Sequence, residues 1–94
     1  MNAMLERAVR IALRDVVDPE MGRSVIDLGL IYGIAASDDG AVRIGMTTTV
    51  RGCPLAGVLK EAVAMAAGAA GGVTSVEVSL IYEPAWTPAM IAAG

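Results

Sequence analysis

The chain contains no histidine and no phenylalanine, and Cys53 is the single cysteine among its 94 residues. Without histidine, a cysteine–histidine nucleophile pair cannot form within one chain. A closed structural zinc site needs four ligands, usually cysteine and histidine, and one thiolate cannot supply it. One thiol also excludes an internal disulfide, so the fold does not depend on an oxidising compartment. What remains is the chemistry of a lone thiol.

Long hydrophobic runs and clusters of positive charge are also missing. The longest apolar run, Ala62 to Val73, has 12 residues, whereas a membrane-spanning helix needs about 20. Charged residues interrupt positions 1–17, which therefore lack the apolar stretch of a signal peptide. The formal net charge is −3, and no basic cluster is available to neutralise nucleic-acid phosphates. We therefore expect a cytoplasmic protein that binds neither membranes nor nucleic acid.

The chain has ample apolar material for a core, since 55% of its residues are hydrophobic. The spacing of these residues is typical of a helix in two segments and of a strand in three. In chain order we predict a helix over 3–17, an irregular loop over 18–27, strands over 28–37 and 41–50, a helix from Pro54 to the glycines at 68–72, a strand over 73–82 and an irregular tail over 83–94. Alternation along 41–50 places Thr47 and Thr49 on the less buried face.

This order predicts the fold class, an α/β (α+β) two-layer sandwich in α-β-β-α-β order. Asp38-Asp39-Gly40 is typical of a hairpin turn, so the first two strands should be antiparallel. The third strand follows a helical crossover, which would make the sheet mixed. We expect one domain over residues 1–94, in which two helices cover a small mixed sheet.

Cys53 lies between Gly52 and Pro54, where the second strand gives way to the second helix. This placement predicts that Cys53 is the residue that caps the helix, with its thiol near the free backbone N–H groups of the first turn. Together with the nearby charge of Arg51, that position would favour the reactive thiolate. The alternative is that Cys53 is a small buried hydrophobic residue, as free cysteines often are.

Other polar residues along the chain are candidates for the same site. Asp18, Glu20 and Asp27 lie within one ten-residue loop, although each could simply cap local backbone groups. Thr49, four residues before the thiol, is a candidate for a hydroxyl turned toward the site, whereas β-propensity explains the two threonines before it. Trp86, in the tail, is more typical of an anchor that packs the tail against the domain.

Four motifs occur in an order and spacing that match a known family. They are Asp18-Pro19-Glu20, Val25 to Tyr32, Met46-Thr47 with Gly52-Cys53-Pro54, and Glu83 to Pro88. In them the chain resembles the PaaD/SufT-like proteins of metal–sulfur cluster biosynthesis, which have an iron–sulfur cluster assembly domain. The resemblance covers nearly the whole chain and implies the same two-layer fold.

The resemblance also implies a role in assembling iron–sulfur clusters or delivering them to apo-proteins. It assigns the functional site to Asp18, Glu20, Thr49 and Cys53. Family members commonly have Thr-Pro-x-Cys at this point, where this chain has Val50, Arg51 and Gly52 before Cys53, so no role for that second threonine carries over. The cysteine-rich C-terminal extension of the phenylacetate-pathway members is absent from this sequence as well.

From the resemblance and the single thiol we expect an assembly or maturation factor rather than a turnover enzyme. Cys53 would be the reactive group and a ligand of iron or a transient iron–sulfur cluster, with Thr49 beside the cluster and Asp18 or Glu20 supplying oxygen ligands. Because iron–sulfur clusters usually take four thiolates, one cysteine per chain favours transfer over storage. The partners expected are apo iron–sulfur proteins and assembly machinery, together with a homodimer.

Two alternatives stay open. In the first, the protein is an interaction adaptor that binds no metal, and Cys53 is structural. In the second, the protein is a thiol-based enzyme, but no general base or second thiol is evident in the sequence.

Overall fold

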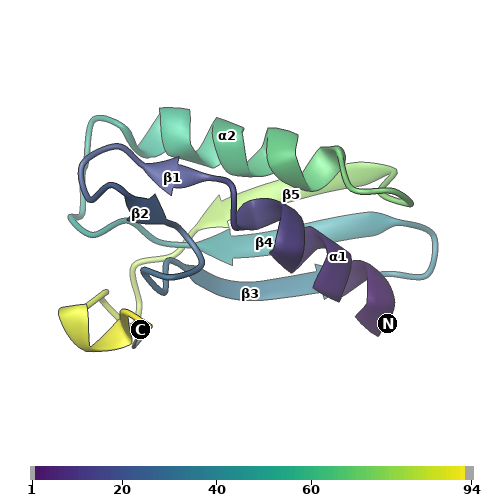
Figure 1. Ribbon diagram of the computed structural model, residues 1–94, viewed down its shortest axis with the longest axis horizontal. Helices are drawn as coiled ribbons and strands as arrows, with labels where there is room; N and C mark the ends of the chain where they lie inside the picture. The colour runs from purple at the N-terminus through teal and green to yellow at the C-terminus, as the bar shows by residue number, and fades with distance from the viewer. Residues whose placement is uncertain (1, 93–94) are drawn as a thin grey trace.

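The computed structural model describes residues 2–92, and its core is a three-stranded sheet covered by two helices (Figure 1). The strands lie in the order β3-β4-β5, with β3 antiparallel and β5 parallel to β4. The elements in chain order are α1 (Ala3–Leu13), β1 (Val17–Asp18), β2 (Arg23–Ser24), β3 (Ile31–Ala36), β4 (Ala41–Met46), α2 (Ala56–Gly68), β5 (Ser75–Leu80) and the 3-10 turn η1 (Pro88–Met90). The predicted fold class and the mixed sheet are confirmed.

The core lies between the helices and one face of the sheet. Strand β4 buries alternate side chains while Arg43, on its other face, is exposed. Helix α1 packs against β3, α2 packs against β5, and the two helices contact each other (Figure 1). The buried residues that these elements contribute are Leu5, Val9 and Leu13 from α1, Val42, Ile44 and Met46 from β4, Leu59, Val63 and Ala67 from α2, and Val78 from β5.

The first helix ends earlier than predicted, at Leu13 instead of residue 17. Proline disfavours the helical conformation of the residue before it, so Pro19 holds Asp18 extended. Val17 and Asp18 accordingly form β1, which pairs with β2 in a two-stranded antiparallel ribbon. The segment predicted as an irregular loop over 18–27 therefore contains strand pairing, and this ribbon brings Asp18 to the edge of the helical layer.

The tail is anchored by hydrogen bonds, as the interpretation of Trp86 predicted. The Trp86 indole Nε1–H donates to the Leu28 carbonyl at 2.7 Å, and the Tyr32 hydroxyl donates to the Pro84 carbonyl at 2.7 Å. These bonds hold the segment after β5 beside the start of β3. Within residues 2–92, no helix has the length and apolar character needed to cross a membrane.

Candidate functional site

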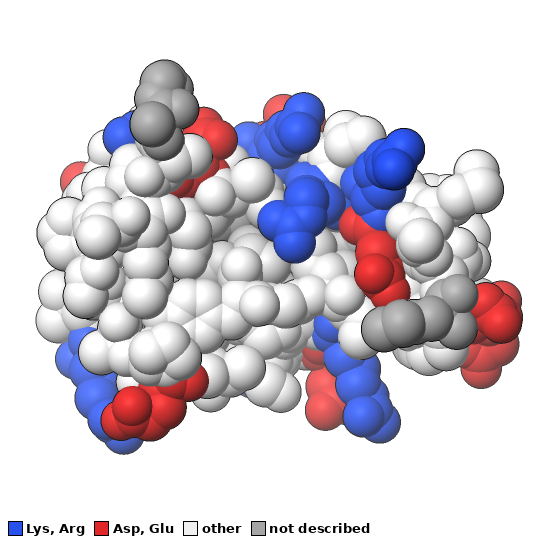
Figure 2. Space-filling model, turned by 90° about the horizontal axis from the view of Figure 1, so that it is seen from below, with Lys and Arg blue, Asp and Glu red and all other residues white. Residues whose placement is uncertain are grey.

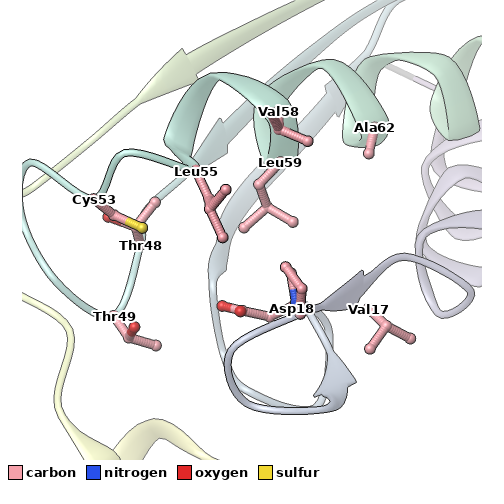
Figure 3. Close-up of a pocket in the computed structure, with 10 residues that line it drawn as sticks. Val17, Asp18, Thr48, Thr49, Cys53, Leu55, Val58, Leu59 and Ala62 are labelled. Carbon is pink, nitrogen blue, oxygen red and sulfur yellow. The ribbon is translucent and has the colours of Figure 1, made fainter.

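The candidate site lies where β4 ends and α2 begins, opposite the short strand β1 (Figure 3). Strand β4 stops at Met46, so the three threonines that follow belong to a loop and not to the predicted longer strand. This loop continues to Leu55 and carries Cys53. Loops held by a rigid scaffold are the usual place for functional groups.

Cys53 does not cap the second helix. The helix begins at Ala56 with Leu55 as its N-cap residue, so the predicted cap position for the thiol is wrong. Two consecutive turns occupy the interval instead: the Cys53 N–H donates to the Val50 carbonyl at 3.3 Å, and the Ala56 N–H donates to the Cys53 carbonyl at 3.0 Å. Gly52 has φ = +79°, a value that only glycine adopts readily and that the first turn requires.

The Cys53 thiol contacts a carboxylate from the other side of the site. Its Sγ lies 3.6 Å from Oε1 of Glu20, in the geometry of an S–H donating to that oxygen. The side chain is half-buried, and Glu20 is exposed. Two residues paired by the sequence analysis are therefore in direct contact, although 33 positions separate them in the chain.

Asp18 shapes the loop that presents Glu20. One carboxylate oxygen of Asp18 accepts the backbone N–H of Glu20 at 2.8 Å, and its backbone carbonyl accepts the N–H of Gly22 at 2.8 Å. Aspartate is favoured in such turns because its side chain bonds backbone two residues on. Asp18 is only 6% exposed, so this acidic residue belongs to the wall of the site and not to its rim.

The three threonines have three different environments. Thr49 is half-buried and lines the site, as predicted, whereas Thr48 is buried and its hydroxyl donates to the Val50 carbonyl at 2.6 Å. Thr47 is completely buried and its hydroxyl has no hydrogen-bond partner among the described residues. The prediction that Thr47 lies on the less buried face is wrong, because strand alternation does not continue beyond Met46.

A pocket of about 180 Å³ opens between β1, the threonine loop and α2. Figure 3 shows the Cys53 sulfur turned toward this space from one side and the Asp18 carboxylate from the other. Its lining residues are Val17, Asp18, Pro19, Thr48, Thr49, Cys53, Leu55, Val58, Leu59 and Ala62. Most of the walls are apolar, and the polar groups are concentrated near the thiol.

Sequence reasoning missed the contribution of α2 to the site. None of the site residues predicted from the sequence lies on the second helix, yet Val58 is 65% exposed at the edge of the pocket, and Val17 is 51% exposed on the opposite edge. An apolar stripe identifies a helix but does not tell which of its residues the core leaves uncovered.

Two other expectations have simple outcomes. Asp27 is exposed and does not line the pocket, so the structure does not bring it together with Asp18 and Cys53. The guanidinium of Arg51 lies over the Tyr82 ring, with Cζ 5.2 Å from the ring centroid, in a cation–π contact.

Within residues 2–92, no group of three cysteine, aspartate or glutamate side chains is arranged to hold a metal ion. The contact between Cys53 and Glu20 offers two donors, one soft sulfur and one hard oxygen. A metal bound there would need further ligands from outside the site. The assignment of Cys53, Asp18, Glu20 and Thr49 to metal or cluster binding therefore stays a prediction.

Comparison with known proteins places this chain in a family. Residues 6–80 match the family described as iron–sulfur cluster assembly protein. The chain belongs to this family. The PaaD/SufT-like resemblance is confirmed, and with it a role in iron–sulfur cluster assembly or maturation.

Individual relatives agree with this assignment. The Fe-S protein maturation auxiliary factor YitW of Bacillus subtilis is 38% identical over 93% of this chain and 85% of its own length. An iron–sulfur cluster carrier protein of Mycobacterium tuberculosis is 37% identical over 81% of this chain but only 20% of its own length. A crystal structure of a domain of unknown function from Bacillus anthracis superposes with a TM-score of 0.91 at 31% identity, covering 97% of this chain and 91% of that one.

Proposed function

We propose that this protein is a cytoplasmic maturation factor that holds iron of a cluster through Cys53 for a short time and passes it to an acceptor. The cluster is cargo in this proposal and not a resident cofactor. The observation that carries it is the 3.6 Å contact between Cys53 Sγ and Glu20 Oε1 in a half-buried site.

The contact gives Glu20 a chemical role. A cysteine must lose its proton to bind a metal, and the Glu20 carboxylate already accepts the hydrogen bond of the thiol. It can therefore take that proton as sulfur binds iron, or contribute an oxygen ligand of its own. The remaining ligands must come from the acceptor, from small thiols or from a second copy of this chain, since each chain supplies one thiolate.

The relatives support an acceptor of a particular kind. The mycobacterial cluster carrier contains a region similar to this chain, and the whole carrier is about five times as long as that region, since the match covers 20% of it. When such a domain is joined to a carrier, the two act at high effective concentration. We propose that a cluster carrier is one partner of this chain, and apo iron–sulfur proteins are others.

Anaerobic incubation with iron and sulfide tests the proposal. Wild-type protein mixed with a cluster carrier should bind iron in an amount that depends on Cys53. It should also speed the activation of an apo iron–sulfur enzyme. Cys53→Ser should lose both effects, and Glu20→Gln should slow transfer by about tenfold, a typical value for a neighbouring group that supports a metal ligand. If the Cys53→Ser variant transfers as fast as wild type, the proposal is wrong.

An adaptor role is favoured by a separate observation, the exposed apolar residues Val17 and Val58 that flank the pocket. In that case Cys53→Ala should bind a carrier with unchanged affinity and complement a deletion strain. The matched variant Val58→Asp, at an exposed position, should then weaken binding while the fold is retained.

A further inference from the structure

The pocket beside Cys53 contains a carboxylate, that of Asp18, with which no cationic side chain among the described residues forms an ion pair. Asp18 is 94% buried, and one of its carboxylate oxygens accepts the Glu20 N–H. Among residues 2–92, no other group hydrogen-bonds to its side chain and no cationic side chain pairs with it. A buried carboxylate without a cationic partner is costly in free energy, so a ligand that supplies a positive charge there would be favoured.

The rest of the pocket defines the shape of that ligand. Leu55, just before α2, and Leu59 and Ala62 of α2 line the space on one side, and Val17 lies on the other (Figure 3). These walls suit a chain of methylene groups, while the carboxylate at the far side from α2 suits a hydrogen-bond donor with positive charge. Lysine and arginine side chains have this combination of an apolar stem and a cationic end.

We propose that the pocket binds a lysine or arginine side chain of a partner protein, presented next to the cysteine that exchanges cargo with Cys53. This inference rests on the proposed function, because it names the chemistry by which an acceptor is recognised at the same site. The basic side chain, once bound in the pocket, fixes the position of the acceptor protein on this surface. The acceptor thiolate is then held close to Cys53. Acceptors that carry an acidic or apolar residue at that position bind less well.

Glu20 is the other carboxylate that could attract a positively charged ligand, since it also places a negative charge beside the thiol. The two carboxylates differ in position: Glu20 is exposed and touches Cys53, whereas Asp18 is buried in the pocket wall. A cation attracted by Glu20 needs only a short stem. A cation attracted by Asp18 needs a stem that enters the pocket.

Reversible disulfide capture by Cys53 separates these cases without iron or a partner. The probes are ω-aminoalkyl disulfides and ω-hydroxyalkyl disulfides with about two to six methylene groups, equilibrated with 2-mercaptoethanol. The Cys53 thiolate attacks one probe sulfur, the probe S–S bond breaks, and the released thiolate takes a proton from water. Intact-mass spectrometry of the whole chain then gives the fraction of protein that carries each probe.

In the wild-type protein we expect long aminoalkyl probes to be captured about tenfold more than hydroxyalkyl probes of equal length, as a charge-assisted hydrogen bond implies. Asp18→Asn keeps an oxygen that can accept the Glu20 N–H but removes the charge, so this preference should fall to nearly one. Glu20→Gln removes the same charge from the other position and should keep the preference for long amines. Ala62→Leu narrows the pocket without touching either carboxylate and should reduce capture of the long probes only.

The proposal is overturned if the wild-type protein shows no preference for amines, or if the preference follows Glu20→Gln and not Asp18→Asn. A preference that is independent of chain length would also overturn it, since the pocket would then not be entered. If Asp18→Asn loses the circular dichroism spectrum of the wild type, the Ala62→Leu comparison decides. Because no cluster is involved, a failure here leaves the iron-transfer experiment unaffected, and the two can be told apart.

Discussion

At the N-terminal end of β4 the chain closes a tight turn, whereas at the C-terminal end it opens into the loop that carries Cys53. In the turn, the Gly40 N–H donates to the Ser37 carbonyl at 3.0 Å, and the Asp39 carboxylate accepts from the Ser37 hydroxyl and the Ala41 N–H. In the loop, the Thr47 hydroxyl has no partner among the described residues, and the thiol of Cys53 meets a carboxylate from a distant segment.

The comparison teaches how to separate structural from functional acidic residues in this fold. The Asp39 carboxylate is exposed to solvent, and its Oδ1 accepts from both the Ser37 hydroxyl and the Ala41 N–H, so its hydrogen bonds serve the turn. One carboxylate oxygen of Asp18 accepts a backbone hydrogen bond that shapes its loop, and the carboxylate faces the pocket. Figure 2, which views the molecule from below Figure 1, shows a group of basic side chains in the upper part of that face, further acidic and basic side chains along its edges, and a broad uncharged area between them.

The largest difference in stability between the two ends of β4 is expected when a glycine at each end is replaced by alanine. Gly40 has φ = +92° and its added Cβ would collide with the carbonyl oxygen of Gly72, whereas Gly52 has φ = +79° and its added Cβ would have open space. Gly40→Ala should lower the free energy of unfolding by about 2–4 kcal/mol, combining backbone strain with overpacking. Gly52→Ala should lower it by about 1–2 kcal/mol from strain alone. Urea unfolding measures both, and equal losses would show that the turn is no more tightly packed than the loop.

The next effect concerns two neighbouring threonines in the loop. Thr47→Val removes a buried hydroxyl that has no partner, so the protein should become more stable by about 1–2 kcal/mol. Thr48→Val removes a hydroxyl that donates to the Val50 carbonyl, and should cost about 1 kcal/mol.

Thermal and urea unfolding of the two variants, which have the same change in composition, provide the test. A loss of stability in Thr47→Val would mean that its hydroxyl is bonded in solution. In that case Thr47 would not support the contrast between a turn whose polar groups are hydrogen-bonded and a loop with an unpaired hydroxyl.

The parts of the fold that could be predicted from the sequence are those set by local pattern. The alternation of Val42, Ile44 and Met46 and the Asp-Asp-Gly turn depend on near neighbours, and both predictions were confirmed. The site depends on contacts between distant segments. The pairing of Cys53 with Glu20 was anticipated only through family motifs, because no local rule links positions 33 apart.

The errors have local causes that are also instructive. Pro54 is compatible with both a helix start and a turn, since its fixed φ suits either. The sequence pattern could not distinguish these, and the structure places two turns before α2. The pocket walls were missed because whether a residue such as Val58 is covered depends on which segment packs over it, and here the ribbon of β1 and β2 leaves it open.

The smallest effect is expected at Asp39, in the turn. The hydrogen bond from the Ser37 hydroxyl, followed by that from the Ala41 N–H, holds the pKa of Asp39 below its ordinary value of 3.8. A carboxylate whose pKa is lower in the folded than in the unfolded state contributes stability above the unfolded pKa, and that contribution is lost as the pH falls through the folded-state pKa. Asp39→Asn should therefore melt at a slightly lower temperature than wild type at pH 7, and the difference should shrink below about pH 4.

Because Asp39 is exposed, solvent screening keeps this difference smaller than those expected at the glycines and threonines. Circular dichroism melting curves of the two proteins between pH 2 and pH 7 provide the measurement, and subtraction removes the titration of the other carboxylates. Ser37→Ala is the matched control: it removes the first cause of the lowered pKa, so the Asp39→Asn difference should be reduced in that background. If the difference is instead constant down to pH 2, the Asp39 carboxylate is not engaged by the turn in solution, and the two ends of β4 differ less in how they use their acidic residues than their hydrogen bonds imply.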